Sequence, residues 1–383
     1  MPRNNAVSSR GASDRIEGDC AWWYAVVVFF KKSAGKGKPR VLSLRIPAPA
    51  SARSALQRRK FSLTNISPAL DSTASVDSQP LVANTEEVPF LAKLATIIAI
   101  VLPMAGVIAA PFFVWGWGFG WVDLGLLLGF YIISALGITV GFHRLFVHRS
   151  FETYMWVKFI FTIFGSMAVQ GSLLNWAAQH RRHHQHSDTP NDPHSPQHHG
   201  SGVWGTLKGF WHAHIGWFFK PDPAGMKKYV KDLASSKTLK IASNLFPLWI
   251  LVGLVLPAVL GGLLTQSWIG CLTGLIWGGL VRVFLVHHVT WSVNSACHLW
   301  GRKPFKSTDD SRNNAIFGIL AMGEGWHNTH HAFPTSARHG LRWWEIDLSY
   351  YVIRTMNYLG LAWGLKVPSK QAQLTMMERR ISN

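Results

Sequence analysis

Two long stretches of this chain carry almost no charge, and they limit what it can fold into. Residues 241–281 contain no Asp, Glu, Lys or Arg, and residues 94–143 contain only Asp123. A helix needs roughly 20 apolar residues to cross a bilayer core of about 30 Å, so each stretch is long enough for two crossings joined by a tight turn. Buried core helices of a soluble protein are the alternative, but their usual length of about 10–14 residues is much shorter.

We therefore expect an all-α integral membrane protein with four transmembrane helices in two hairpins. The predicted spans are Leu94–Phe113, Leu124–Phe142, Ala242–Leu264 and Trp268–Val289. The short connections 114–123 and 265–267 contain no Lys or Arg, whereas the other connections are rich in both. The positive-inside rule then places both termini and the central segment on one side of the membrane, where a helical cap domain is expected. Residues 149–179 are also apolar, and we expect an interfacial helix there rather than a fifth span.

The first 88 residues differ in composition from the rest of the chain. Residues 1–60 hold 13 Lys and Arg against 3 acidic residues and are rich in serine, which is typical of an organelle transit peptide. Eleven apolar residues, Cys20–Phe30, instead resemble the core of a signal peptide. We expect residues 1–88 to be a targeting or disordered presequence, residues 89–365 the membrane-bound domain and residues 366–383 a C-terminal tail. The alternatives are a misplaced start codon or a disordered basic tail with no targeting function.

The formal net charge of +19 does not by itself identify a partner. A strongly basic chain suggests nucleic acid or an anionic membrane surface. Much of the excess lies in residues 1–60, and most other basic residues lie outside the predicted spans. We attribute the charge to targeting and membrane orientation, and expect no nucleic-acid partner. Three scattered cysteines also exclude a disulfide-stapled secreted domain.

Nine of the 18 histidines form four short groups on the side expected to carry the cap. The groups are His143 with His148, the triplet His180, His183 and His184, then His298 four residues after Asn294, and the triplet His327, His330 and His331. On a helix each triplet shares one face and can aim several imidazoles at one point. The pair separated by five residues is about 140° apart on an ideal helix, which suits ligands of two metals or a helix that ends between them. Nine imidazoles exceed the needs of one ion, so we expect a two-metal centre.

Isolated histidines in polar loops are usually solvated. We expect this of the histidines at the following positions: His194, His198, His199, His212, His214 and His339. A histidine-rich metal transporter or sensor is a rival interpretation of the grouped ones. Transporters usually hold their ligands within spans near the midplane, whereas the spans here contain only Arg282, His287 and His288, all towards one end of the fourth.

The ordered motifs H-x4-H, H-x-x-H-H, N-x3-H and H-x-x-H-H occur with two further segments, GEGWHNTHHAFP at Gly323–Pro334 and HSDTPNDPHS at His186–Ser195. In this order and spacing they resemble the membrane-bound fatty acyl desaturases of the Δ9 type. The resemblance covers roughly residues 89–365. The related Δ12/ω3 desaturases and sterol-type hydroxylases begin with H-x3-H, whereas this chain has H-x4-H.

The resemblance implies that the nine histidines hold two irons, with Asn294 reaching one of them through a water. O2 and two electrons would be used to place one cis double bond, at Δ9 or, in a plastid enzyme, at Δ7. Removing hydrogen from two adjacent methylenes lies beyond side-chain acid–base chemistry, so no catalytic residue beyond the metal ligands is expected. Glu324, Asp188 and Asp192 are predicted to fix the imidazole tautomers. A hydroxylase with the same centre is the alternative.

The acyl channel is predicted from the helix that ends at the first histidine. Counting back by turns from His143 places Thr139 on the ligand side with Tyr131 on its flank, and we expect Tyr131 to close the channel. A lipid-facing or packing role is the alternative for Tyr131. Animal-type acyl-CoA desaturases have Arg and Asp just before the second histidine box, where this chain has Ala178 and Gln179. This departure favours a glycerolipid over CoA as the acyl carrier.

The electron donor is expected to be a separate protein, because the haem motif of a fused cytochrome b5 is not found. The donor would be ferredoxin in a plastid membrane or cytochrome b5 in the endoplasmic reticulum. We expect a multi-pass protein of a plastid membrane, with the endoplasmic reticulum as the alternative.

Overall fold

A computed structural model describes residues 88–117, 120–222 and 225–377. Residues 1–87 of the predicted presequence lie outside the described residues. The predicted domain boundaries therefore stay predictions. Residues 370–376 of the predicted tail form a helix, α15 (Lys370–Met376), whose last carbonyl accepts a hydrogen bond from the backbone N–H of Lys306 at 2.8 Å.

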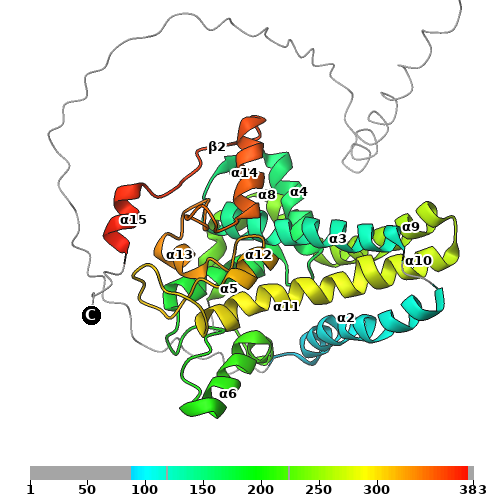
Figure 1. Cartoon of the computed structure of the whole chain (residues 1–383), viewed down its shortest axis with the longest axis horizontal. Helices are drawn as coiled ribbons and strands as arrows, with labels where there is room; N and C mark the ends of the chain where they lie inside the picture. The colour runs from blue at the N-terminus through cyan, green and yellow to red at the C-terminus, as the bar shows by residue number, and fades with distance from the viewer. Residues whose placement is uncertain (1–87, 118–119, 223–224, 378–383) are drawn as a thin grey trace, which may run out of the picture. The chain divides into compact units, whose positions relative to one another are not determined.

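Within the described residues, four helices are long and apolar enough to cross a membrane, as predicted. They comprise α2 (Phe90–Trp117), α3 (Trp121–Leu136) continued by η1 (Gly137–Val147), α9 (Phe246–Thr265), and α10 (Trp268–Gly274) continued by η4 (Leu275–Val281), α11 (Arg282–Ser295) and η5 (Ala296–His298). Figure 1 shows α3, α9, α10 and α11 running along one another, with α2 beside α11. The all-α membrane fold predicted from the uncharged stretches is confirmed.

The span boundaries differ from the prediction at the histidine side. The second span runs on to Val147 and the fourth to His298, so both helices carry histidines directly. The third begins at Phe246 because Ala242 belongs to a separate short helix, α8 (Lys237–Asn244). The helix ends on the histidine side contain polar and charged residues, so hydropathy alone could not predict these boundaries.

Close backbone contacts hold the second hairpin together. A Cβ added to Gly261 would lie 2.2 Å from the carbonyl oxygen of Gly270, and one added to Gly274 would lie 2.4 Å from that of Pro257. Small residues at such positions let membrane helices approach closely, which is the main source of their association in lipid. Arg282 in α11 is fully buried and donates to the carbonyl oxygen of Gly278 at 3.1 Å.

The cap is built from short helices at the end of the spans where α11 finishes (Figure 1). They are α4 (Met155–Ser166), α5 (Leu173–His186), α6 (Gly202–His214), η2 (Gly216–Phe219), η3 (Met226–Val230), α7 (Lys231–Ala234), α12 (Ala315–Leu320), α13 (His327–Ala332) and α14 (Leu348–Tyr358), with an antiparallel pair of strands, β1 (Glu152–Thr153) and β2 (Ala362–Trp363). The 12 residues of α4 are too few to cross a bilayer, which excludes a fifth span between the first two histidine groups.

Candidate metal centre

The nine grouped histidines come together as two clusters. The five-histidine group comprises His143, His148, His180, His184 and His330, and the four-histidine group comprises His183, His298, His327 and His331. Within each group, one nitrogen of every imidazole lies within 4.8 Å of the others. The ligand roles predicted for these residues remain a proposal, but their convergence is the arrangement a metal ion requires.

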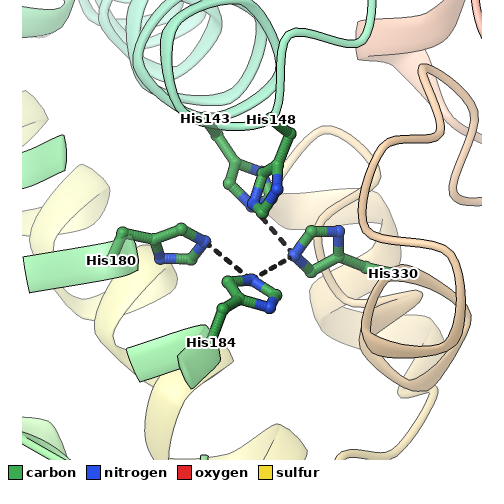
Figure 2. Close-up of side chains that lie close together, drawn as sticks. All are labelled: His143, His148, His180, His184 and His330. Carbon is green, nitrogen blue, oxygen red and sulfur yellow. Dashed lines mark hydrogen bonds between the residues drawn. The ribbon is translucent and has the colours of Figure 1, made fainter. Parts of the chain in front are cut away.

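The five-histidine group draws its side chains from η1, α5 and α13, and Figure 2 shows their rings pointing toward one another. The Nε2 atom of His330 lies 2.8 Å from that of His184 and 3.1 Å from that of His143. The Nε2 atoms of His180 and His184 are 3.1 Å apart. The indole of Trp176 stacks on the ring of His180 with centroids 4.9 Å apart, so ring packing helps to fix this group.

His143 and His148 belong to the same group, so their predicted division between two metals is wrong. The reason is the π-helical winding of η1, which a regular 3.6-residue period cannot anticipate. The backbone N–H of His148 donates to the carbonyl of His143 at 3.0 Å, an i→i+5 bond that turns both rings to the same side. The other alternative, a helix that ends between the two residues, is confirmed because η1 ends at Val147.

Each triplet serves both groups rather than one point. On α5, His180 and His184 face the five-histidine group while His183 faces the other. On α13 the division is reversed, because His330 alone joins the five-histidine group. Positions i and i+4 are about 40° apart on a helix, whereas i+3 lies about 60° to the opposite side of i. A triplet placed between two clusters therefore reaches both.

Carboxylates orient three of the four imidazoles in the four-histidine group. The Nδ1 atom of His183 lies 2.9 Å from Asp192, and that of His298 lies 2.8 Å from Asp188. Both aspartates were predicted to fix imidazole tautomers, and that role stays a prediction. A third contact, 2.6 Å from His331 Nδ1 to Asp309 Oδ2, was not predicted.

Asp309 could have been found from the sequence. Only three acidic residues occur between the third and fourth histidine groups: Asp309, Asp310 and Glu324. Each carboxylate contact of this kind occupies Nδ1 and leaves Nε2 free for a metal.

Glu324 links the five-histidine group to a buried charge network. Its Oε2 lies 2.6 Å from His143 Nδ1, a close contact that is not aligned as a hydrogen bond. Its Oε1 accepts from Arg144 Nε at 3.2 Å, and Arg144 also pairs with Asp347 at 2.9 Å. His339 completes the network, with Nδ1 3.1 Å from Arg144 Nη2. Two carboxylates thus balance a guanidinium that is fully buried beside the histidines.

The expectation that the isolated histidines are solvated is wrong for three of the six. His339 is fully buried, and His194 and His214 are 3% and 8% exposed. His214 Nε2 lies 3.0 Å from His288 Nδ1, and the ring of His194 lies 4.4 Å from that of His183. Loop sequence could not reveal their burial, because contacts from distant segments of the chain enclose them.

Burial is the largest cause of the pKa shifts in the centre. Together with the neighbouring imidazoles, it holds the pKa values of five histidines well below their usual range: His148, His180, His184, His327 and His330. Burial likewise lowers the pKa of His331 to about 4. Burial alone would raise the pKa of Asp188, but hydrogen bonds from His298 and Ser195 lower it to about 2. These six imidazoles are therefore neutral at pH 7, the form that binds metals.

The donor set fits a metal centre. Four buried imidazole nitrogens of the two groups have no hydrogen-bond partner among the described residues: His143 Nδ1, His148 Nε2, His327 Nδ1 and His330 Nδ1. Converging neutral imidazoles repel one another's lone pairs unless a cation or a proton lies between them. Imidazole nitrogen suits iron, zinc, copper and nickel, so the geometry supports a metal centre without selecting the element.

A cavity of about 620 Å³ reaches the centre. Its inner end is lined by His143, His180 and His327, and Asn294 of α11 forms part of the same wall. This places Asn294 where a water-mediated ligand would act, a role that stays a prediction. The volume lies in the roughly 300–1,000 Å³ range of sites for small ligands.

The two residues predicted to line the acyl channel lie elsewhere. The hydroxyl of Tyr131 donates to the carbonyl of Leu320 at 2.8 Å, and Thr139 Oγ1 lies 2.7 Å from Ser349 Oγ. Neither residue is part of the wall of this cavity. The neighbouring Ile138 is, because the π-helical winding of η1 turns that position toward the cavity. The channel role of Tyr131 and Thr139 stays a prediction without a contact to support it.

Residues 115–363 match the family described as fatty acid desaturase. The chain is 44% identical over 271 residues to hex-5-enoyl-[acyl-carrier protein] acetylenase of Moorena producens, which covers 70% of this chain and 84% of that protein. It is 42% identical over 258 residues to an sn-1 stearoyl-lipid 9-desaturase of Synechocystis, covering 66% and 75% of the two chains. It is 38% identical over 266 residues to palmitoyl-monogalactosyldiacylglycerol delta-7 desaturase of Arabidopsis thaliana, covering 67% and 66%.

Proposed function

This chain belongs to the fatty acid desaturase family and is an oxidoreductase of fatty acyl chains, and from that premise we propose that it forms a cis double bond at a centre of two irons. The observation that carries the proposal is the convergence of two groups of imidazoles at the inner end of a cavity that begins among the spans. The five-histidine group would hold one iron and the four-histidine group the other, with Asn294 beside the cavity. When bound, the irons supply the activation of O2 that breaking an unactivated C–H bond requires.

The protein's own contribution is to hold the ligands and the chain in place. Asp188, Asp192 and Asp309 fix three imidazoles with Nε2 directed inward. The cavity positions the methylenes beside the centre and keeps water away from them. Gln170 Nε2 donates to Thr290 Oγ1 at 2.6 Å in the wall of the cavity, so two polar side chains satisfy each other there rather than binding water.

We propose that the acyl chain is carried by a glycerolipid. The buried side chain of Ala178 offers no charge for a phosphate, and Gln179 donates to the carboxylate of Asp222. Lys220 lies in the same part of the wall, but the carboxylate of Asp222 balances its charge. The cavity mouth therefore has no net positive charge to attract a CoA phosphate. Two of the relatives are named for lipid-linked substrates, one attacked at position 9 and one at position 7, which makes Δ9 and Δ7 the candidate positions.

We propose a separate electron donor, ferredoxin or cytochrome b5. Arg302 and Lys306 are exposed on the segment that brings Asp309 to His331, so an acidic carrier would dock close to the four-histidine group. A plastid membrane is the proposed location, in keeping with the composition of residues 1–60, and the endoplasmic reticulum is the alternative.

The test is expression of the full chain with its electron donor, followed by mapping of double bonds in each lipid class. We expect new cis monoenes in a glycerolipid fraction and none with His183→Ala. Hydroxy acids in place of monoenes would make the protein a hydroxylase, and altered metal uptake with unchanged lipids would make it a transporter. An enoyl chain belongs among the substrates tested, because one relative is named an acetylenase.

A further inference from the structure

The cavity lies against a single face of the first span. Ala92, Ala95, Thr96 and Ala99 of α2 line it, at the three- and four-residue spacing that puts side chains on one face of a helix. The opposite face carries larger apolar residues that are open to the surroundings, among them Ile98, which is 49% exposed. A wall one helix thick therefore separates the cavity from the lipid that surrounds the spans.

The wall is open near the histidine side and closed at the far end. At the far end, a Cβ added to Gly106 of α2 would lie 2.4 Å from Leu280 Cβ in η4, so the two helices touch there. Near the histidine side, Ala92 and Ala95 line the cavity and are also exposed, so the cavity reaches the molecular surface at this point. Phe246 and Ile250, at the beginning of α9, form the facing wall.

The cap end of the same cavity holds buried polar atoms without a hydrogen-bond partner in the described part of the chain, although His194 Nδ1 lies 3.8 Å from Asp192 Oδ1. Gln179 and His194 are 8% and 3% exposed, and both line the cavity. Gln179 Oε1, His194 Nδ1 and the indole Nε1 of Trp217 are buried without a hydrogen-bond partner among the described residues. Leaving buried polar groups unpaired costs about 1–3 kcal/mol each. A ligand that brings oxygen acceptors to this end would satisfy the N–H groups of Trp217 and His194.

The surface of α6 marks the level of the membrane interface. Gly205 and Gly209 pack inward, since a Cβ on Gly209 would lie 1.9 Å from the carbonyl of Pro196. The opposite face exposes Val203, Trp204, Leu207 and Trp211, which are 50–75% accessible. An apolar face with tryptophans suits the boundary between headgroups and acyl chains. Figure 1 shows α6 beside the beginning of α2, so the opening of the cavity lies at that boundary.

We propose that the cavity is filled sideways from the leaflet on the histidine side, through the opening between the beginnings of α2 and α9, and that its occupant is one acyl chain of a diacyl glycerolipid. The ester oxygens of that lipid accept hydrogen bonds from the N–H groups of Trp217 and His194, while the chain passes along the alanine face of α2 toward the histidines. This inference rests on the proposed function, because it assigns the substrate of the same cavity.

Photolabelling tests the access route without requiring turnover. The full chain is placed in nanodiscs of phosphatidylcholine in which some molecules carry a diazirine on a saturated sn-1 chain, and the labelled residues are mapped after irradiation. We expect adducts at Ala95, Ala99 and Ile250. Ala99→Trp fills the cavity and lowers this labelling about tenfold, equivalent to about 1.4 kcal/mol of binding. Ile98→Trp, on the lipid-facing side of the same turn, leaves it unchanged.

A second variant tests the ester contact. Trp217→Phe keeps the ring and removes the N–H, so labelling by the ester-linked probe falls about fivefold, the worth of one hydrogen bond of about 1 kcal/mol. Labelling by an ether-linked probe, which lacks the carbonyl, stays the same. Equal labelling of wild type and Ala99→Trp, or preferential labelling by a diazirine acyl-CoA added from water, would overturn the proposal. Labelling needs neither metal nor electrons, so correct labelling without desaturation would refute the proposed function alone.

Discussion

The two histidine groups are built on different principles. In the four-histidine group, three of four imidazoles have a carboxylate on Nδ1, and these contacts span 2.6–2.9 Å. Among the described residues of the five-histidine group, only His143 meets a carboxylate, and Glu324 divides its charge between that imidazole and Arg144. The other rings of this group are fixed by one another and by packing, as the stacking of Trp176 on His180 illustrates.

The two groups should therefore differ in which substitutions weaken their metal binding. The four-histidine group has no ligand to spare, and its geometry depends on outer carboxylates. The five-histidine group has an extra imidazole, and its ligands come from a π-helix whose backbone sets the direction of two of them. Loss of a ligand or a carboxylate should therefore harm the first more than the second.

The largest expected effect comes from removing a ligand from each group in turn. His183→Ala leaves three imidazoles, so we expect about one metal to be lost per chain and activity to fall by more than the roughly 10–100-fold that loss of an outer partner costs. His148→Ala leaves four imidazoles and keeps more of its metal. Metal content and monoene yield are measured together. Equal losses of metal in the two variants would show that the two groups do not differ in this way. An active His183→Ala would refute the ligand assignment.

Next in size is removal of a carboxylate from the four-histidine group. Asp309→Asn keeps the shape of the side chain but loses the charge that orients His331, and metal affinity should fall about 10–100-fold. Chelator competition measures this affinity. Asp310→Asn is the matched control, because Asp310 is exposed and makes its hydrogen bond through the backbone. A control that weakens metal binding equally would point to the segment rather than to the carboxylate.

A smaller effect is expected from Glu324→Gln. One of five imidazoles loses its carboxylate, so metal affinity should fall by about tenfold, the lower end of the range for outer partners. The same chelator competition applies, with the exposed Glu152→Gln as control. If Glu324→Gln weakens binding more than Asp309→Asn does, the two groups depend on their carboxylates in the reverse order.

The smallest effect is expected from Tyr131→Phe. It removes the hydrogen bond to the carbonyl of Leu320, worth about 0.5–1.5 kcal/mol of the free energy of unfolding. The position of the double bond should not change, since Tyr131 is not part of the cavity wall. Thermal unfolding and product mapping check both statements. A shifted double bond would restore the channel role that the sequence predicted.

The fold could be predicted from the sequence because membrane-spanning helices exclude charged residues over stretches of about 20 residues. The grouping of the histidines could also be predicted, because their spacing along a helix is a local property of the sequence. Sequence analysis missed the common cluster of His143 and His148, since the π-helical winding of η1 departs from the regular period. It missed Asp309 and the burial of His339, because these depend on contacts such as that between Arg144 and His339, 195 residues apart. Local pattern finds the ligands, whereas long-range packing decides what surrounds them.

Elemental analysis of the purified full-length chain tests whether the two groups of imidazoles hold two irons. We expect about two irons per chain, one for each group of imidazoles. One metal ion per chain, or a full complement of a metal other than iron in an active preparation, would contradict it.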